Sequence, residues 1–102
     1  MAVKLAVENP QGNSGDFWQV IRYSYDHVNE IVKAVMAQWR TKADKQGGKD
    51  TMRTLPLEVS VARAVFLSKT GLEVHELLQI RAKGTAQNPG VLFGGVDEDD
   101  DA

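Results

Sequence analysis

Two histidines are the first residues of this 102-residue sequence to consider for chemistry. His27 has Glu30 three places later, and His75 lies between Glu73 and Glu76, so both stand beside groups that bind metals. In helical di-iron proteins the Glu precedes the His by three residues, whereas here the His comes first. A His-Glu-x-x-His zinc pattern is absent from the sequence. We therefore predict no metal site and no cofactor.

The remaining catalytic signals are a glycine pair and a few serines. Residues 47–49, Gly-Gly-Lys, lack the leading glycine and the following Ser or Thr of a phosphate-binding loop. Ser24, Ser60 and Ser68 lack the glycine-flanked turn of a nucleophile elbow. The chain contains no cysteine, which excludes a disulfide framework, a thiolate zinc site and a Cys nucleophile. We predict that the protein is not an enzyme.

Charge is unevenly distributed along the chain. Twelve Lys and Arg against fourteen Asp and Glu give a formal charge of -2. Between residues 33 and 53 there are six basic and two acidic residues, whereas residues 97–101 are all acidic. Such a layout is typical of proteins in which an acidic tail competes with an anionic ligand for a basic patch, or recruits a basic partner. The simpler interpretation is a solvated helix end and a tail that keeps the protein soluble.

The first element that must position these residues is a predicted long helix over about 16–45. Asp16 is a suitable N-cap residue, and no Pro or Gly occurs between Asp16 and Lys45. Apolar residues recur at helical intervals in two adjacent rows. These rows contain Phe17, Trp18, Ile21, Tyr25, Val28, Val32, Val35, Met36 and Trp39.

The length of this helix favours self-association. A helix of about 28 residues spans roughly 42 Å, whereas a domain of this size has a radius of gyration of about 13 Å. A second copy of the chain is therefore expected to cover the apolar stripe, and the protein is predicted to be a homo-oligomer. The predicted interface is Phe17, Trp18, Tyr25, Val32, Met36 and Trp39. Alternatively, the later helices cover the stripe within one monomer.

The segment after the glycine loop has two interpretations. Residues 56–69 are predicted to be a helix with Pro56 in its first turn. The alternative is a strand at 55–61, where apolar residues alternate with others. A third helix is predicted over 72–83, ended by Gly84. The predicted fold class is all-α, a long N-terminal helix plus a shorter helical pair, with α+β as the alternative if 55–61 is a strand.

The two ends of the chain flank one predicted domain. Residues 1–15 are expected to be a flexible arm or a short strand, residues 16–94 a single helical domain, and residues 95–102 an acidic disordered tail. The sequence lacks the continuous apolar stretch of a secretory signal or of a membrane span. We therefore predict a cytoplasmic protein with no membrane partner.

Gly71, Leu72, Leu77 and Ile80 place apolar residues one, six and nine positions after a glycine. With this spacing, residues 63–83 resemble the helix-turn-helix of bacterial DNA-binding proteins, or the two helices of a ribbon-helix-helix repressor. The pattern also occurs in ordinary helical hairpins. Glu73 and Glu76 depart from it, because they open the helix that would approach phosphates. The resemblance implies DNA binding through this segment only.

Two functions follow. The leading prediction is a non-enzymatic protein–protein interaction module, such as a small regulator, inhibitor or assembly component, that self-associates through the aromatic-rich helix. The alternative is a DNA-binding transcriptional regulator that uses residues 63–83 with the basic 40–53 region. Its predicted contacts are Arg40, Lys42, Lys45, Lys49, Arg53, Lys69, His75, Gln79, Arg81 and Lys83.

Overall fold

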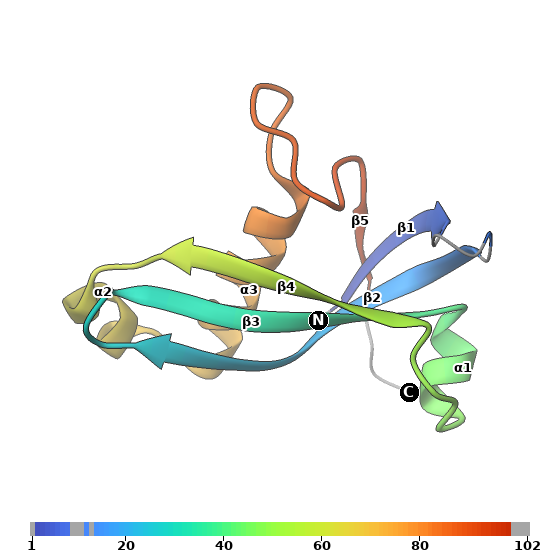
Figure 1. The fold of residues 1–102 in the computed structure, drawn as a ribbon, viewed down its shortest axis with the longest axis horizontal. Helices are drawn as coiled ribbons and strands as arrows, with labels where there is room; N and C mark the ends of the chain where they lie inside the picture. The colour runs from blue at the N-terminus through green and yellow to red at the C-terminus, as the bar shows by residue number, and fades with distance from the viewer. Residues whose placement is uncertain (1, 9–11, 13, 99–102) are drawn as a thin grey trace.

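The fold is an antiparallel sheet with helices at one face and one end (Figure 1). A computed structural model describes residues 2–8, 12 and 14–98. Within these residues the strands, in the spatial order β4-β3-β2-β1-β5, are β1 (Ala2–Glu8), β2 (Ser14–Asp26), β3 (Ile31–Trp39), β4 (Arg53–Ser60) and β5 (Val96–Glu98). The helices are α1 (Lys42–Gln46), α2 (Arg63–Ser68) and α3 (Gly71–Lys83).

The predicted long helix is wrong, because residues 16–45 form most of a β-hairpin. β2 and β3 pair antiparallel from Phe17 opposite Trp39 to Asp26 opposite Ile31. Both strands are rich in Val, Ile, Tyr and Trp, which fit a pleated, half-buried surface. Only the end of the predicted helix is helical, as α1. The all-α fold class is therefore wrong.

The turn of this hairpin is built without Gly or Pro, which is why the sequence shows no break. The carboxylate of Asp26 accepts hydrogen bonds from the backbone N–H groups of Val28 at 2.9 Å and Asn29 at 3.1 Å, and from the Asn29 amide at 2.8 Å. The bonds from Asn29, followed by that from Val28, favour the charged carboxylate and lower the pKa of Asp26. Glu30 then adopts a φ of 54°, which most non-glycine residues avoid.

The two faces of the sheet explain the apolar spacing that suggested a helix. Successive side chains of a strand point to opposite faces. Trp18 and Met36 lie on the face covered by α3, whereas Phe17 and Trp39 belong to a separate apolar cluster. A bulge between residues 20 and 22 shifts the alternation of β2. The buried apolar residues of the two strands, displaced by the bulge, therefore recur at intervals that resemble those of a helix.

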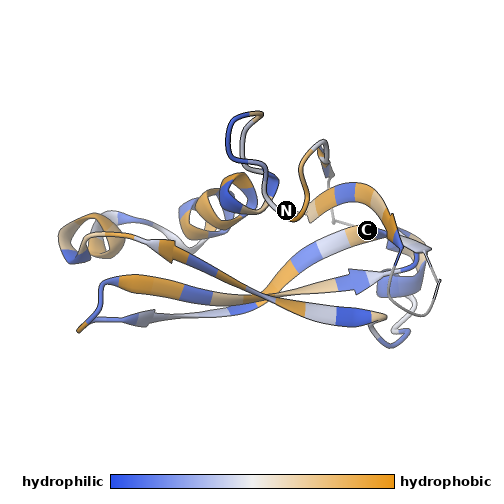
Figure 2. Ribbon diagram, turned by 45° about the horizontal axis from the view of Figure 1, so that its top comes forward, coloured by the Kyte–Doolittle hydropathy of each residue, from blue (hydrophilic) through white to orange (hydrophobic). Residues whose placement is uncertain are grey.

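The main core lies between the sheet and α3, and Figure 2 shows α2 and α3 on the same side of the strands. α3 buries Val74, Leu78 and Ala82, which lie one turn apart along a single side of the helix. Leu92, in the turn after α3, is fully buried, and its N–H donates to the Ala82 carbonyl at 2.8 Å. This turn therefore closes the core beyond the end of α3.

The segment after the glycine loop is a strand followed by a short helix. The strand alternative holds, because Arg53–Ser60 form β4. The helix predicted over 56–69 is wrong in its first half, and its second half is α2. The third predicted helix is confirmed as α3. The helical-hairpin description is wrong because a strand replaces most of the first helix.

Both ends of the described chain belong to the sheet. β1 lies between β2 and β5, with Ala2 opposite Glu98 and Lys4 opposite Val96. Within the predicted N-terminal arm, Ala2–Glu8 form a strand, and residues 1, 9–11 and 13 lie outside the described residues. The predicted tail begins as β5, and residues 99–102 lie outside the described residues.

The two edges of the sheet are protected against pairing with another strand. Pro56 lies in the middle of edge strand β4, where the absence of an N–H costs no hydrogen bond within the sheet. The Arg81 side chain donates through Nε to the Glu58 carbonyl of the same strand at 3.4 Å. The opposite edge, β5, has only three residues. Strand addition is therefore disfavoured at both edges.

Candidate nucleic-acid interface

The residues predicted to form a protein interface lie inside the molecule. Phe17, Trp18, Val32, Met36 and Trp39 each expose 8% of their surface or less. The sixth residue, Tyr25, is half-buried: its ring stacks on Phe66 with the centroids 4.0 Å apart, and its hydroxyl donates to the Val61 carbonyl. These side chains stabilise the fold and offer no surface to a second copy.

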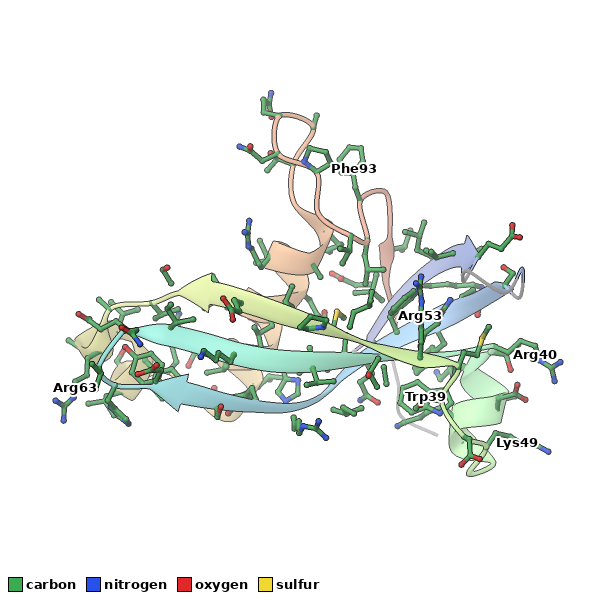
Figure 3. The ribbon with its side chains drawn as sticks, in the orientation of Figure 1. Trp39, Arg40, Lys49, Arg53, Arg63 and Phe93 are labelled. Atoms are coloured by element: carbon green, nitrogen blue, oxygen red, sulfur yellow. The ribbon has the colours of Figure 1, made fainter. Side chains whose placement is uncertain are left out.

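The basic residues between 40 and 49 gather around α1, at one end of the sheet (Figure 3). α1 begins after Thr41, whose hydroxyl accepts a hydrogen bond from the Asp44 N–H at 3.1 Å, and it ends at Gly47. In Figure 3, Arg40 and Lys49 extend away from the sheet at this end. The surface that we call the basic end consists of Lys4, Arg40, Lys42, Lys45 and Lys49.

Lys4 joins this group through strand pairing. Lys4 lies opposite Phe17, and Phe17 lies opposite Trp39, so β1 runs beside the strands that lead to α1. A hollow of about 230 Å³ is lined by Lys4, Asp16, Phe17, Thr41, Lys42 and Ala43. No local sequence signal connects Lys4 with Arg40, and the prediction therefore omitted it.

Trp39 holds the glycine loop that follows α1 in place through a hydrogen bond. Its indole Nε1–H donates to the Lys49 carbonyl at 3.2 Å, and the Lys49 N–H donates to the Asp44 carbonyl at 3.0 Å. Trp39 itself is 8% exposed and packs against Phe17, with the ring centroids 6.2 Å apart. The position of Lys49 is therefore set by the core.

The basic end carries an excess of positive charge although it includes acidic neighbours. Arg40 forms an ion pair with Asp44 at 3.2 Å, while its side chain remains 72% exposed. The same end of the sheet carries four carboxylates, those of Asp16, Asp44, Asp50 and Glu8, which lies opposite Ser14. The five cations of the basic end therefore leave one positive charge in excess.

Arg53, predicted to belong to the same basic region, has a different environment. Its guanidinium lies 5.4 Å from the centre of the Trp18 ring, and its Nε donates to Oε1 of Gln38 at 2.9 Å. Gln38 is fully buried, and its Nε2 donates to the carbonyls of Val7 at 2.7 Å and Gly15 at 2.8 Å. Arg53 therefore completes a network that joins β1, β2, β3 and β4.

The predicted contacts between residues 63 and 83 are divided between the α2 end of the sheet and α3. α2 lies at the end of the sheet opposite α1 (Figure 1), and Lys69 follows it directly. His75 packs edge-on against Tyr23 with the ring centroids 5.6 Å apart. Gln79 is only 1% exposed, which removes it as a direct contact to DNA. Lys69, His75 and Gln79 therefore do not form one exposed surface with the basic residues around α1.

The other cations of α3 have structural partners. Arg81 donates to the Glu58 carbonyl, and Lys83 forms a 2.7 Å ion pair with Asp97 of β5. At the start of α3, Thr70 and Glu73 cap each other, and the Thr70 bonds lower the pKa of Glu73. The exposed side chains of α3 carry two acidic groups and one basic group; they are Leu72, Glu73, Glu76, Ile80 and Arg81.

The described residues contain no group of three or more His, Asp or Glu side chains that could hold a metal ion. His27 packs against Tyr25, and His75 against Tyr23, so each histidine contacts a tyrosine ring. Over the same part of the chain, no helix combines the length and apolar character needed to cross a membrane.

Comparisons with protein-family models, with curated proteins and with solved structures found no match to this chain.

Proposed function

We propose that the protein binds nucleic acid through the basic end. The observation that carries this proposal is the gathering of Arg40, Lys42, Lys45 and Lys49 around α1, with Lys4 beside them across the hollow. Lys and Arg side chains that neutralise phosphates release counterions, which is the main source of sequence-independent affinity for DNA. The binding predicted here is therefore weak and strongly dependent on salt.

The proposed contact is with the phosphate backbone. α1 has five residues, so it spans about 7.5 Å, less than the width of a major groove. The aromatic residues at this end, Phe17 and Trp39, are buried and unavailable for stacking on bases. Base-specific recognition has no support at the basic end. This proposal uses residues 40–49 and Lys4, without the segment that resembles a helix-turn-helix.

Removal of two cations from the basic end will weaken DNA binding and reduce its salt dependence. In Arg40→Gln/Lys49→Gln, two phosphate contacts are lost, so the slope of log K against log salt will decrease by about 1.8, with affinity at low salt reduced about tenfold. The measurement is fluorescence anisotropy with a labelled mixed-sequence DNA duplex over a series of salt concentrations.

The matched control is Arg63→Gln/Lys69→Gln, which removes the same charge at the opposite end, where Figure 3 labels Arg63. The control is expected to keep most of the affinity and the slope. Absence of binding by the unchanged protein at low salt, or equal losses in both variants, would contradict the proposal.

A second candidate is self-association through the side of the molecule that carries α2 and α3. Most of the exposed large hydrophobic residues belong to residues 65–96, namely Val65, Leu67, Leu72, Ile80, Val91, Phe93 and Val96. Leu72 and Ile80 lie two turns apart on α3, and Phe93 follows in the turn beyond it. Exposed apolar residues of this kind mark protein–protein contacts when they are contiguous. The occupant that we assign to this surface is a second copy.

For this second candidate, sedimentation velocity over a concentration series is expected to show a dimer for the unchanged protein. The variant Ile80→Glu/Phe93→Glu is expected to remain monomeric, because a charged group replaces an apolar contact. If the unchanged protein is monomeric at every concentration, self-association through this surface is excluded.

A further inference from the structure

The helices leave one face of the sheet uncovered. α2 and α3 lie on one side of the strands (Figure 2), and Tyr23, Val32 and Ala34 face the core beneath them. Successive side chains of a strand point to opposite faces, so Arg22 and Lys33 belong to the other face. Apart from α1 at one end, no helix in the described part of the chain lies on that face. The surface that we call the open face consists of Gln19, Arg22, Ser24, Lys33, Val35, Ala37, Thr54, Pro56 and Glu58.

The open face is continuous with the basic end. Lys4 pairs with Phe17, and Phe17 pairs with Trp39, so these three side chains share the open side of the sheet. The Trp39 indole donates to the Lys49 carbonyl, which places the loop after α1 over one end of this side. Val35 lies four residues before Trp39 in β3, about 13 Å along the strand. A ligand at the basic end can therefore extend onto the open face.

The open face contains a hollow with an apolar floor and charged groups around it. The hollow has a volume of about 310 Å³, and pockets for small ligands begin at about 300 Å³. Val35 lies between Arg22 of β2 and Pro56 of β4 in the strand register. The other outward side chains that line the hollow are Ser24, Lys33 and Glu58.

Arg22 and Lys33 are available to an anionic ligand. Both side chains are exposed, and neither forms an ion pair within the described residues. Glu58, opposite Lys33, also lines the hollow, whereas the nearby Asp26 carboxylate is bonded to the hairpin turn. The lining therefore carries one positive charge in excess. Packing the sheet of a second copy against this face would bury these charged groups at a high cost, so the open face favours a charged ligand.

We propose that the open face binds a single strand of nucleic acid, with an unpaired base in the hollow and a phosphate beside Arg22 and Lys33. A base offers an apolar face to the floor of the hollow, and its phosphate carries the charge that the two cations attract. The bases of a duplex are paired and stacked, so they cannot enter. Entry of the strand from the basic end rests on the proposed function, whereas the contact at the hollow does not.

Binding of a single strand and of a duplex separates this site from the basic end. In Arg22→Gln/Lys33→Gln, affinity for a labelled thymidine oligonucleotide is expected to fall about tenfold at low salt, and the slope of log K against log salt to decrease by about 1.4. Affinity for the labelled duplex is expected to change less than about threefold, since the duplex does not enter the hollow. Both affinities are measured by fluorescence anisotropy over a series of salt concentrations.

Two further variants serve as controls, and circular dichroism shows whether each variant is folded. The charge-preserving Arg22→Lys/Lys33→Arg is expected to keep most of the affinity for the single strand. Arg63→Gln/Lys69→Gln removes the same charge at the α2 end and is expected to keep it as well. The proposal is overturned if Arg22→Gln/Lys33→Gln loses no affinity for the single strand, or loses it equally for the single strand and the duplex.

Failure of this proposal is distinguishable from failure of the proposed function. If Arg40→Gln/Lys49→Gln weakens binding of both ligands and Arg22→Gln/Lys33→Gln weakens neither, the basic end remains and the open face is refuted. If only Arg22→Gln/Lys33→Gln weakens binding of the single strand, the basic end is refuted and the open face remains. Absence of binding of either ligand at low salt refutes both.

Discussion

Replacing Gln38 with Met is expected to destabilise the protein by about 2–5 kcal/mol, because a buried carbonyl, a partly buried carbonyl and Arg53 lose their partner. Gln38 is fully buried, and its amide donates to Val7 at 2.7 Å and to Gly15 at 2.8 Å. For a domain of this size, each kcal/mol lowers the melting temperature by about 4–8 °C. Thermal unfolding followed by circular dichroism is expected to show a decrease of at least about 10 °C.

The local geometry explains why Met cannot substitute for Gln38. A Cβ at Gly15 would lie 2.6 Å from the Trp39 carbonyl oxygen and 3.1 Å from Nε2 of Gln38, so the strands approach closely only because residue 15 is glycine. Met is similar to Gln in size, but its side chain has no hydrogen-bond donor. A melting temperature within about 3 °C of the unchanged protein would show that the network contributes little.

The substitution Gln79→Met is expected to stabilise the protein, in contrast to Gln38→Met. Gln79 is 1% exposed, and neither amide atom has a hydrogen-bond partner in the part of the chain that the structure describes. Replacing an unsatisfied amide with an apolar group of similar volume removes its desolvation penalty, about 1–3 kcal/mol. Met and Gln have similar helix propensities. Gln79→Met is therefore expected to raise the melting temperature by about 4–8 °C or more.

Gln46→Met serves as the control for both changes, since Gln46 is exposed at the end of α1. A surface substitution of this kind is expected to change stability by about 0.5 kcal/mol or less. A lower melting temperature for Gln79→Met would mean that an ordered water molecule or a bound group satisfies the amide.

The sequence predicted the last part of the fold better than the first. Glycines at 71 and 84 bound α3. The alternation over 55–61 corresponds to β4, which is the alternative to the helix predicted over 56–69. The β2–β3 hairpin was missed because Asp26 and Glu30 make its turn without the usual breakers. The bulge in β2 then disturbed the alternation that would have identified the strand.

The candidate site was predictable only where it is local in sequence. Four of its cations lie between residues 40 and 49 and were identified from charge alone. Lys4 belongs to the basic end because β1 pairs with a segment that is distant from it in sequence. Arg53 does not belong to it, because its side chain contacts Trp18 and Gln38. The charge pattern of the sequence does not reveal the position of either residue, since both positions depend on the strand register.

The strand order also has a consequence for the folding pathway. β1 to β4 are neighbours in chain order, so each of these pairings closes a short loop, whereas β5 pairs with β1 across nearly the whole chain. From the unfolded chain, that closure carries a length-dependent entropy cost of about 4 kcal/mol, against about 1.5 kcal/mol for a five-residue loop. Three residues of strand contribute too little to meet this cost alone. The four-stranded meander and α3 must therefore assemble before β5 docks, so Asp97 and Glu98 reach the sheet in the last step of folding.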